Sequence, residues 1–236
     1  MNFMNNSMPM KAVLILIAFT TIILLGGCKP KPSVLFLVPQ PENEKDQIRF
    51  KNKFIGTYLS KSDSSILYIT SGMIIREQNM RFGESLKHMD SGYVIKNDSL
   101  FGDLFPGGVP IKIENDCFYV HSIFRDTIFN ISGNNILRFY KGNYFLNYRY
   151  NKDNWEVKTL EFINRHRILI SDIKTPEIDK LKNATEVKSY PENGSDSNTA
   201  IITYIAKPTK KELKKFMKSG GFSGSEEFVK VRLGKR

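Results

Sequence analysis

Residues 111–120 read IKIENDCFYV, two runs rich in apolar and aromatic residues on either side of Asn115-Asp116. Such runs are typical of strands, and Asn and Asp tolerate the left-handed backbone conformations that a tight turn requires. Residues 93–100 read YVIKNDSL and repeat the pattern around Asn97-Asp98. The sequence therefore predicts two β-hairpins close together in the chain.

Further strand-like segments flank these hairpins. They are residues 54–59, 66–70 and 73–76 on one side and residues 126–131 and 136–140 on the other. Between the hairpins, residues 105–110 contain two prolines and two glycines, which favours a loop or a bent edge over an interior strand. We therefore predict a mainly β fold, an antiparallel meander or barrel-like domain.

A short motif recurs in the second half of the chain. Tyr140–Tyr144 repeats the aromatic-x-Gly-x-Tyr order of Phe54–Tyr58, and segments patterned as paired strands follow both copies, at residues 66–75 and 155–170. This order predicts two similar halves, residues 48–135 and 136–236. Coincidence is the alternative, because glycine and aromatic residues are common where strands begin or bulge.

Two short helices are predicted near the C-terminus. The first is capped by Thr175, has Pro176 as its first residue and buries Ile178 and Leu181.

The second helix begins with the capping box Thr209-Lys210-Lys211-Glu212 and ends at Gly220-Gly221. A helix of about ten residues is too short to persist alone in water, so we expect it to pack on the sheet. Strands are predicted on either side of it, at residues 200–206 and 227–233. The apolar face available for packing consists of Leu213, Phe216 and Met217.

The N-terminal region has the order of an export signal. Lys11 precedes fourteen apolar or hydroxyl residues, 12–25, which lead to Gly26, Gly27 and Cys28. Fourteen helical residues span only about 21 Å, whereas a hydrocarbon core is about 30 Å thick. We therefore expect export and cleavage rather than a retained membrane span. Several methionines precede this segment, so the initiator stays open.

Leu25-Gly26-Gly27-Cys28 resembles the lipobox of bacterial lipoprotein precursors. The resemblance implies cleavage between Gly27 and Cys28, a diacylglycerol on the Cys28 thiol, and attachment to a bacterial membrane through that lipid. Lys29 stands where many Gram-negative lipoproteins of the inner membrane have aspartate, which favours the outer membrane. A plain secretory signal with an unrelated cysteine and an uncleaved anchor are the alternatives.

Residues 28–47 are predicted to form a lipidated tether, because four prolines keep such a segment extended. Val34–Val38 is an apolar island within it, either a short strand on the body or a segment near the lipid surface. Residues 1–27 are then the signal peptide and residues 48–236 a β-rich globular domain. This plan resembles that of uncharacterised β-rich lipoproteins of the bacterial cell envelope.

The chain is basic. Its 236 residues are 41% apolar, enough for a sizeable core, and carry a net charge of +11, which favours anionic surfaces. Residues 207–236 hold ten basic and three acidic side chains. A solvated helix face is the alternative to a binding role for this tail. The candidate contacts with an anionic surface are Lys210, Lys211, Lys214, Lys215 and Lys218.

The sequence contains few residues in a pattern typical of catalysis. His88, His121 and His166 are the only histidines and lack metal-ligand spacing. We predict no catalytic residue, no metal, no nucleic-acid partner, and no cofactor apart from the covalent lipid on Cys28. The expected function is a non-enzymatic binding or assembly module for an envelope protein or a small apolar ligand. An anchored hydrolase that uses His121 is the alternative.

Three further side chains are candidates for modification or packing. Cys117 is predicted to be a buried residue of a strand, with a reactive thiol as the alternative. Asp98-Ser99-Leu100 and Asp126-Thr127-Ile128 are similar to sites at which some Gram-negative bacteria glycosylate exported proteins. Ser99 follows a turn and is predicted to be accessible, whereas Thr127 is predicted to lie near a strand start and to be less accessible.

Overall fold

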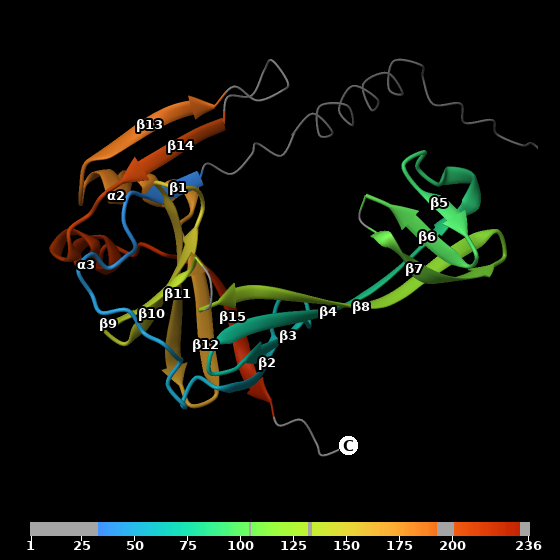
Figure 1. Ribbon diagram of the computed structural model, residues 1–236, viewed down its shortest axis with the longest axis horizontal. Helices are drawn as coiled ribbons and strands as arrows, with labels where there is room; N and C mark the ends of the chain where they lie inside the picture. Colours follow the sequence, from blue (N-terminus) through green and yellow to red (C-terminus); the bar gives the residue numbers. More distant parts are fainter. Residues whose placement is uncertain (1–32, 104, 132–133, 193–200, 232–236) are drawn as a thin grey trace, which may run out of the picture.

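The computed structural model describes residues 33–103, 105–131, 134–192 and 201–231. A body with two hydrophobic cores carries a small lobe on a two-stranded arm (Figure 1). The predicted mainly β fold is confirmed, with a large, mostly antiparallel sheet and two short helices near the C-terminus. The predicted signal peptide, residues 1–27, lies outside the described residues.

The body is built from one continuous sheet that curls around its core. Along the sheet the order is β13-β14-β1-β11-β12-β15-β2-β3-β4-β8, with β10 pairing both β11 and β9. All these pairs are antiparallel except β1 with β14. The strands that lie wholly in the body are β1 (Ser33–Phe36), β2 (Gly56–Ser60), β3 (Ile66–Ile69), β9 (Ile136–Tyr140), β10 (Asn143–Arg149), β11 (Trp155–Asn164), β12 (Arg167–Asp172), β13 (Val187–Glu192), β14 (Ile201–Ala206) and β15 (Gly224–Val231).

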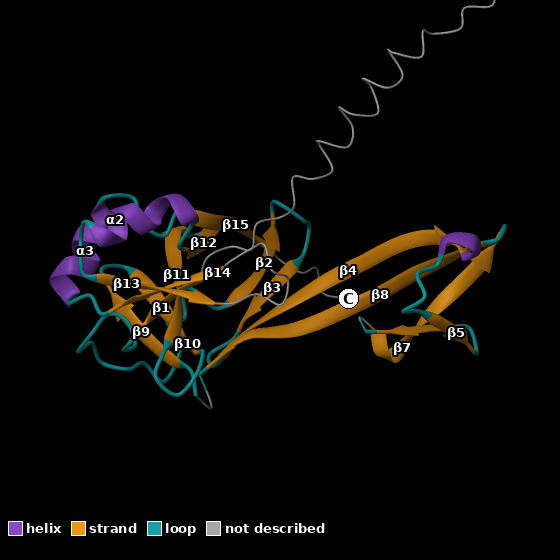
Figure 2. Ribbon diagram, turned by 90° about the horizontal axis from the view of Figure 1, so that it is seen from above, coloured by secondary structure: helices purple, strands orange, loops and turns teal. Residues whose placement is uncertain are grey.

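Two long strands leave the body together. β4 (Met73–Ser85) and β8 (Cys117–Asn130) pair along their whole lengths, so that Ser85 stands opposite Cys117. We call residues 75–79 and 123–128 the arm; none of them is buried. We call residues 80–122 the lobe, which adds η1 (Leu86–His88), β5 (Val94–Lys96), β6 (Ser99–Gly102) and β7 (Phe105–Glu114) to the strand ends (Figures 1 and 2).

Both predicted hairpins are confirmed in the lobe. Asn97 and Asp98 have φ values of 50° and 53° in the turn from β5 to β6, and the Asn115-Asp116 turn from β7 to β8 has 49° and 59°. Residues 105–110 form a bent edge rather than a loop. Their part of β7 pairs with β6, whereas β7 from Ile111 onwards pairs with β8.

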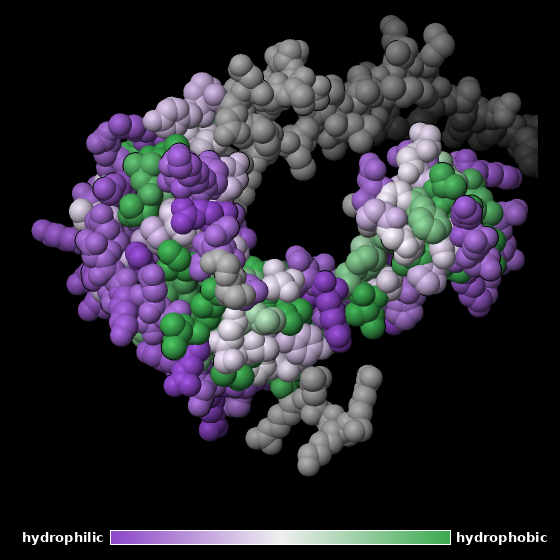
Figure 3. Space-filling model, in the orientation of Figure 1, coloured by the Kyte–Doolittle hydropathy of each residue, from purple (hydrophilic) through white to green (hydrophobic). Residues whose placement is uncertain are grey.

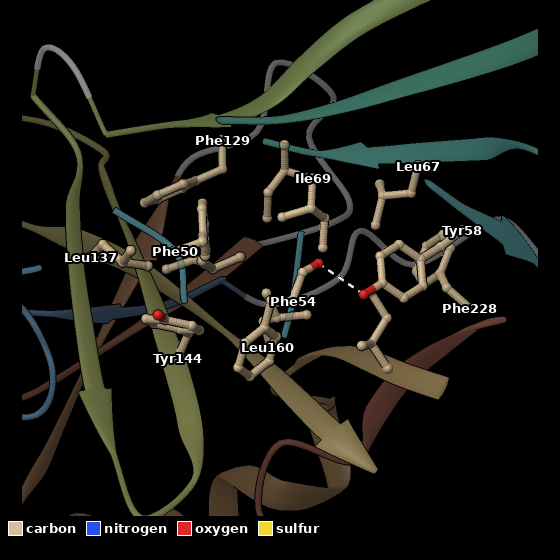
Figure 4. Close-up of a cluster of buried hydrophobic side chains, with 13 residues drawn as sticks. Phe50, Phe54, Tyr58, Leu67, Ile69, Phe129, Leu137, Tyr144, Leu160 and Phe228 are labelled. Atoms are coloured by element: carbon tan, nitrogen blue, oxygen red, sulfur yellow. Dashed lines mark hydrogen bonds between the residues drawn. The ribbon is translucent and has the colours of Figure 1, made fainter. Parts of the chain in front are cut away.

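Aromatic side chains fill the main core of the body (Figure 4). The Tyr144 ring lies 4.9 Å from the Phe54 ring and 5.1 Å from the Phe50 ring, centroid to centroid, in edge-to-face contacts that such rings favour. Because Phe54 and Tyr144 belong to opposite predicted halves, those halves share one core. Their glycines also differ in position: Gly56 begins β2, whereas Gly142 lies in the turn from β9 to β10.

The helices cover the second core, at the end of the body far from the lobe (Figures 1 and 2). They are η2 (Thr175–Glu177), α2 (Ile178–Lys182) and α3 (Lys210–Lys218). The predicted cap at Thr209 is confirmed, because its hydroxyl accepts the backbone N–H of Glu212. Leu213 and Phe216 are fully buried, as expected of a docked helix.

The predicted cap at Thr175 is wrong, although Ile178 and Leu181 are buried as expected. Thr175 lies inside the first turn, and Lys174 occupies the capping position. The carboxylate of Glu177 accepts the backbone N–H of Lys174 at 3.1 Å, which starts the turn one residue earlier.

Residues 33–50 pack on the body, which differs from an extended tether. β1 lies between β14 and β11, so the apolar island is a strand. Farther along, the buried amide of Asn147 donates to the backbone oxygens of Gln40, at 2.9 Å, and Ile136, at 3.0 Å. Phe50 then enters the main core. The prolines limit the length of the strand in this segment, but they do not prevent the segment from packing on the body.

Candidate functional site

An ion-pair network holds the base of the arm. Arg76 of β4 donates to Glu226 of β15 at 2.9 Å and to Asp63 of the β2–β3 turn at 2.8 Å. Partial burial opposes ionisation of Asp63, but hydrogen bonds from Ser65 hold the pKa of its carboxyl well below the usual range. These contacts tie the first exposed part of the arm to two other elements of the body.

Beyond that base, strand alternation sorts the side chains of β4 and β8 onto two faces. One face packs into the lobe core with Met80, Phe82, Phe118, Val120 and Phe124. The register places Arg81 opposite His121 and Gly83 opposite Tyr119 on the other face. We call this second set of residues the Tyr119 face: Glu77, Asn79, Arg81, Gly83, Tyr119, His121, Ile123 and Arg125.

The Tyr119 face has an open hollow around Gly83. A methyl group at this position would lie 2.6 Å from Cδ1 of Tyr119, so the tyrosine ring lies across the glycine. The open hollow has a volume of about 490 Å³ and is lined by residues 81–83 and 119–121. A glycine beneath an aromatic ring on the neighbouring strand is a common way to stabilise a glycine-containing pair.

The Tyr119 face exposes apolar surface beside charged groups. Tyr119 is 46% exposed and Ile123 is 60% exposed, and Arg81 and His121 are also exposed. Hydrophobic side chains stand among polar ones across the arm and lobe (Figure 3). Tyrosine and arginine are enriched among the residues that carry binding energy at protein interfaces, so this face is our candidate functional site.

One end of the Tyr119 face is already engaged within the protein. Glu77 accepts from Arg125 at 2.7 Å and from the hydroxyl of Tyr68 at 3.4 Å. This carboxylate is therefore committed to the base of the arm. The groups that remain exposed for a partner are those nearer the lobe, around Tyr119 and Ile123.

The three histidines lie on three different elements. His88 lies in η1 and His121 on β8, whereas His166 lies in the turn from β11 to β12 and accepts from the Arg165 side chain at 2.9 Å. Within the described part of the chain, no group of three or more His, Cys, Asp and Glu side chains could hold a metal ion. His121, the residue of the hydrolase alternative, lies on an open sheet surface beside Tyr119.

Cys117 is a free, half-buried thiol at the start of β8, which differs from the predicted buried position. Alternation explains the difference, because Phe118 points into the lobe core and its neighbours point away from it. The Tyr119 face itself was missed by sequence reasoning. The sequence does carry a signal for this face, because polar residues alternate with Met80 and Phe82 in one strand and with Phe118 and Val120 in the other. That signal identifies a shared face only once the pairing of the two strands is known.

The two glycosylation candidates have the opposite order of exposure from the one predicted. Thr127 is exposed on β8, well inside that strand, whereas Ser99 is half-buried at the start of β6. The hydroxyl of Ser99 donates to the backbone oxygen of Asn97 at 3.4 Å. The turn before Ser99 is exposed as expected, but the serine hydroxyl is directed back to that turn by its hydrogen bond to Asn97.

The lysines of α3 divide into two groups. Lys210 forms an ion pair with Glu44 at 2.7 Å, and Lys215 donates to the backbone oxygen of Asn183 at the same distance. These two lysines therefore contribute to packing of the helix. The exposed lysines that stay available for an anionic surface are Lys211, Lys214 and Lys218.

The predicted lipid site Cys28 and the cleavage site after Gly27 lie outside the described residues. Among the helices that the structure describes, none is long and apolar enough to cross a membrane. Comparisons with protein-family models, with curated proteins and with solved structures find no match to this chain.

Proposed function

We propose that this chain is a lipid-anchored protein of the bacterial envelope, attached to the outer membrane through Cys28, that binds a protein partner with its Tyr119 face. The observation that carries the binding role is the pair of exposed residues Tyr119 and Ile123 beside the hollow over Gly83. An aromatic anchor beside an aliphatic one, ringed by polar groups, is typical of the centre of a protein interface.

The arrangement of body and lobe supports this role. The main core of the body is filled by the protein's own side chains (Figure 4). Binding of a small apolar ligand inside the body therefore has less support. The arm instead extends from the body and carries the lobe at its end (Figure 1), and the Tyr119 face lies on the two strands of this extension. The barrel-like, curled body serves as a rigid base, and the lobe provides the surface for assembly with another envelope protein.

Lipid attachment is tested with labelled palmitate in living bacteria. The wild-type protein should incorporate the label and partition into detergent, whereas Cys28→Ala should do neither. Equal labelling of the variant contradicts the anchor and leaves the partner role to be judged separately.

Partner binding is tested by photo-crosslinking in the same cells. Benzoylphenylalanine in place of Ile123 should capture a discrete partner, and the same amino acid in place of Ile163, which is 41% exposed on the body, should not. Gly83→Val displaces the Tyr119 ring and should lower the capture at position 123 severalfold. Equal capture at both positions, or capture that is indifferent to Gly83→Val, contradicts the proposed site.

The alternative of an anchored hydrolase makes a different prediction for the neighbouring histidine. His121→Ala removes one exposed group and should leave crosslinking from position 123 within about twofold of wild type, since most interface residues contribute little individually. A hydrolytic activity of the intact protein that disappears in His121→Ala, with crosslinking retained, favours the enzyme instead.

A further inference from the structure

β1, β13 and β14 share a surface that faces away from the helices. Ser33 of β1 stands beside Thr203 of β14, which in turn stands beside Tyr190 of β13. Alternation places Val34 and Phe36 on the opposite surface, where they pack in the second core with the helices. Alternation places Leu37, Lys188, Tyr190 and Ile205 on the outer surface, together with the buried residues Leu35 and Thr203.

This outer surface has a hollow with apolar and basic walls. The hollow measures about 380 Å³, and Leu37 and Tyr190 are 46% and 47% exposed. We call it the anchor-side groove, lined by Leu37, Glu186, Lys188, Tyr190, Ile205 and Lys207. Both lysines are exposed, and the one acidic residue of the lining, Glu186, lies 4.0 Å from Lys188, at the distance limit of an ion pair.

The position of this groove along the chain limits what can lie against it. Five residue steps separate Cys28 from Ser33, and an extended chain covers at most about 18 Å in five steps. Tyr190 is two strands away from Ser33, or about 10 Å at the usual strand spacing. A lipid on Cys28 therefore brings the membrane surface within reach of this groove.

The charge distribution also favours the body over the lobe as the part that meets anionic lipid. Residues 80–122 carry four basic and six acidic side chains, a net charge of −2, so the rest of residues 28–236 carries +12. The stripe on α3 is a weaker candidate than the groove, because two of its five lysines, Lys210 and Lys215, bind protein groups.

We propose that the anchor-side groove rests on the headgroup layer of the anionic bilayer that holds the lipid, with Tyr190 and Leu37 at the interface and Lys188 and Lys207 on phosphate. Tyrosine and long basic side chains favour this depth because each combines an apolar stem with a polar end. The inference rests on the lipid anchor of the proposed function. It adds that the body is seated in one orientation, which fixes how the arm is presented.

The test uses the full lipidated protein, reconstituted into vesicles of phosphatidylcholine and phosphatidylglycerol with bromine on the acyl chains. Tyr190→Trp places a reporter in the groove, and Ile163→Trp, at a residue that is 41% exposed near the other end of β11 from Trp155, is the matched control. Trp155 is buried and contributes the same background to both. We expect bromine to quench the tryptophan at position 190 at least threefold more than the one at position 163.

Charge variants separate the groove from the helix. Lys188→Gln with Lys207→Gln should lower quenching at position 190, whereas Lys211→Gln with Lys214→Gln should leave it unchanged. The reverse result overturns the proposal in favour of α3. Equal quenching at positions 190 and 163 in protein that has entered the vesicles overturns the seating alone. A protein that carries no lipid and stays outside the vesicles overturns the anchor as well.

Discussion

The body and the lobe are made of similar antiparallel strands, but they differ in how much each buries. Among the described residues, thirteen buried side chains form the main core of the body and eleven form its second core, whereas five form the core of the lobe. Between them runs an arm without a buried residue. Because apolar burial is the main favourable term in folding, the body should fold without help from the lobe.

The largest effect should follow from truncation before Pro208, which removes α3 and β15. β15 pairs with β12 on one side and β2 on the other, and Phe228 belongs to the main core. Loss of an internal strand opens the sheet in the middle, so we expect no cooperative thermal transition by circular dichroism. An unchanged melting midpoint, with only weaker binding to anionic vesicles, would show instead that this tail is a separate basic arm.

The next effect compares one phenylalanine from each region. Phe54→Ala should destabilise the body by about 3–5 kcal/mol, a large part of a typical total of about 5–15 kcal/mol. Phe105→Ala, in the lobe core, should leave the main thermal transition in place and speed amide hydrogen exchange only within residues 80–122. Equal lowering of the main transition by both variants would mean that body and lobe unfold as one unit.

An alkaline effect should be confined to the body. Burial raises the pKa of Tyr58 to about 12, and its hydroxyl donates to the backbone oxygen of Phe54 at 2.8 Å. Burial also raises the pKa of Tyr144 and Tyr148. A raised pKa contributes stability that is complete below the unfolded value of about 10 and is lost as pH rises toward the folded value.

Thermal melts between about pH 8 and pH 11 check this expectation. The midpoint of the body should fall as the pH passes about 10, and Tyr58→Phe should make that fall shallower while lowering stability at neutral pH through the lost hydrogen bond. A pH response that Tyr58→Phe leaves unaltered would place the alkaline transition at another group.

The smallest effect should come from removing the whole lobe. Replacing residues 80–122 by Asn-Gly joins Asn79 to Ile123, which already stand opposite each other, through residues that favour a tight hairpin turn. The melting midpoint of the body should change by less than about 4 °C, while crosslinking to the partner disappears. A body that no longer folds would show that the lobe, despite its small core, is needed for folding.

The sequence predicted the lobe hairpins well but missed the arm that carries them. Asn115-Asp116 marks its turn through its own backbone preference. Residues 77–85 contain only isolated apolar side chains, because β4 is exposed on one or both faces there and needs no hydrophobic run. The candidate site was missed for the same reason: Gly83 and Tyr119 are 36 positions apart in the chain and meet only through the register of two strands.

Neighbouring residues were enough to predict the hairpin turns, the Thr209 cap, the end of α3 and the buried face with Leu213 and Phe216. Long-range packing set the insertion of β15 between β12 and β2, the docking of residues 33–50 through Asn147, and the meeting of the predicted halves in one core. Turns and caps are set by local dihedral angles and nearby hydrogen bonds, so they leave a readable pattern. Pairing between distant strands depends on which apolar surfaces can be buried together, and no short stretch of this chain records that choice.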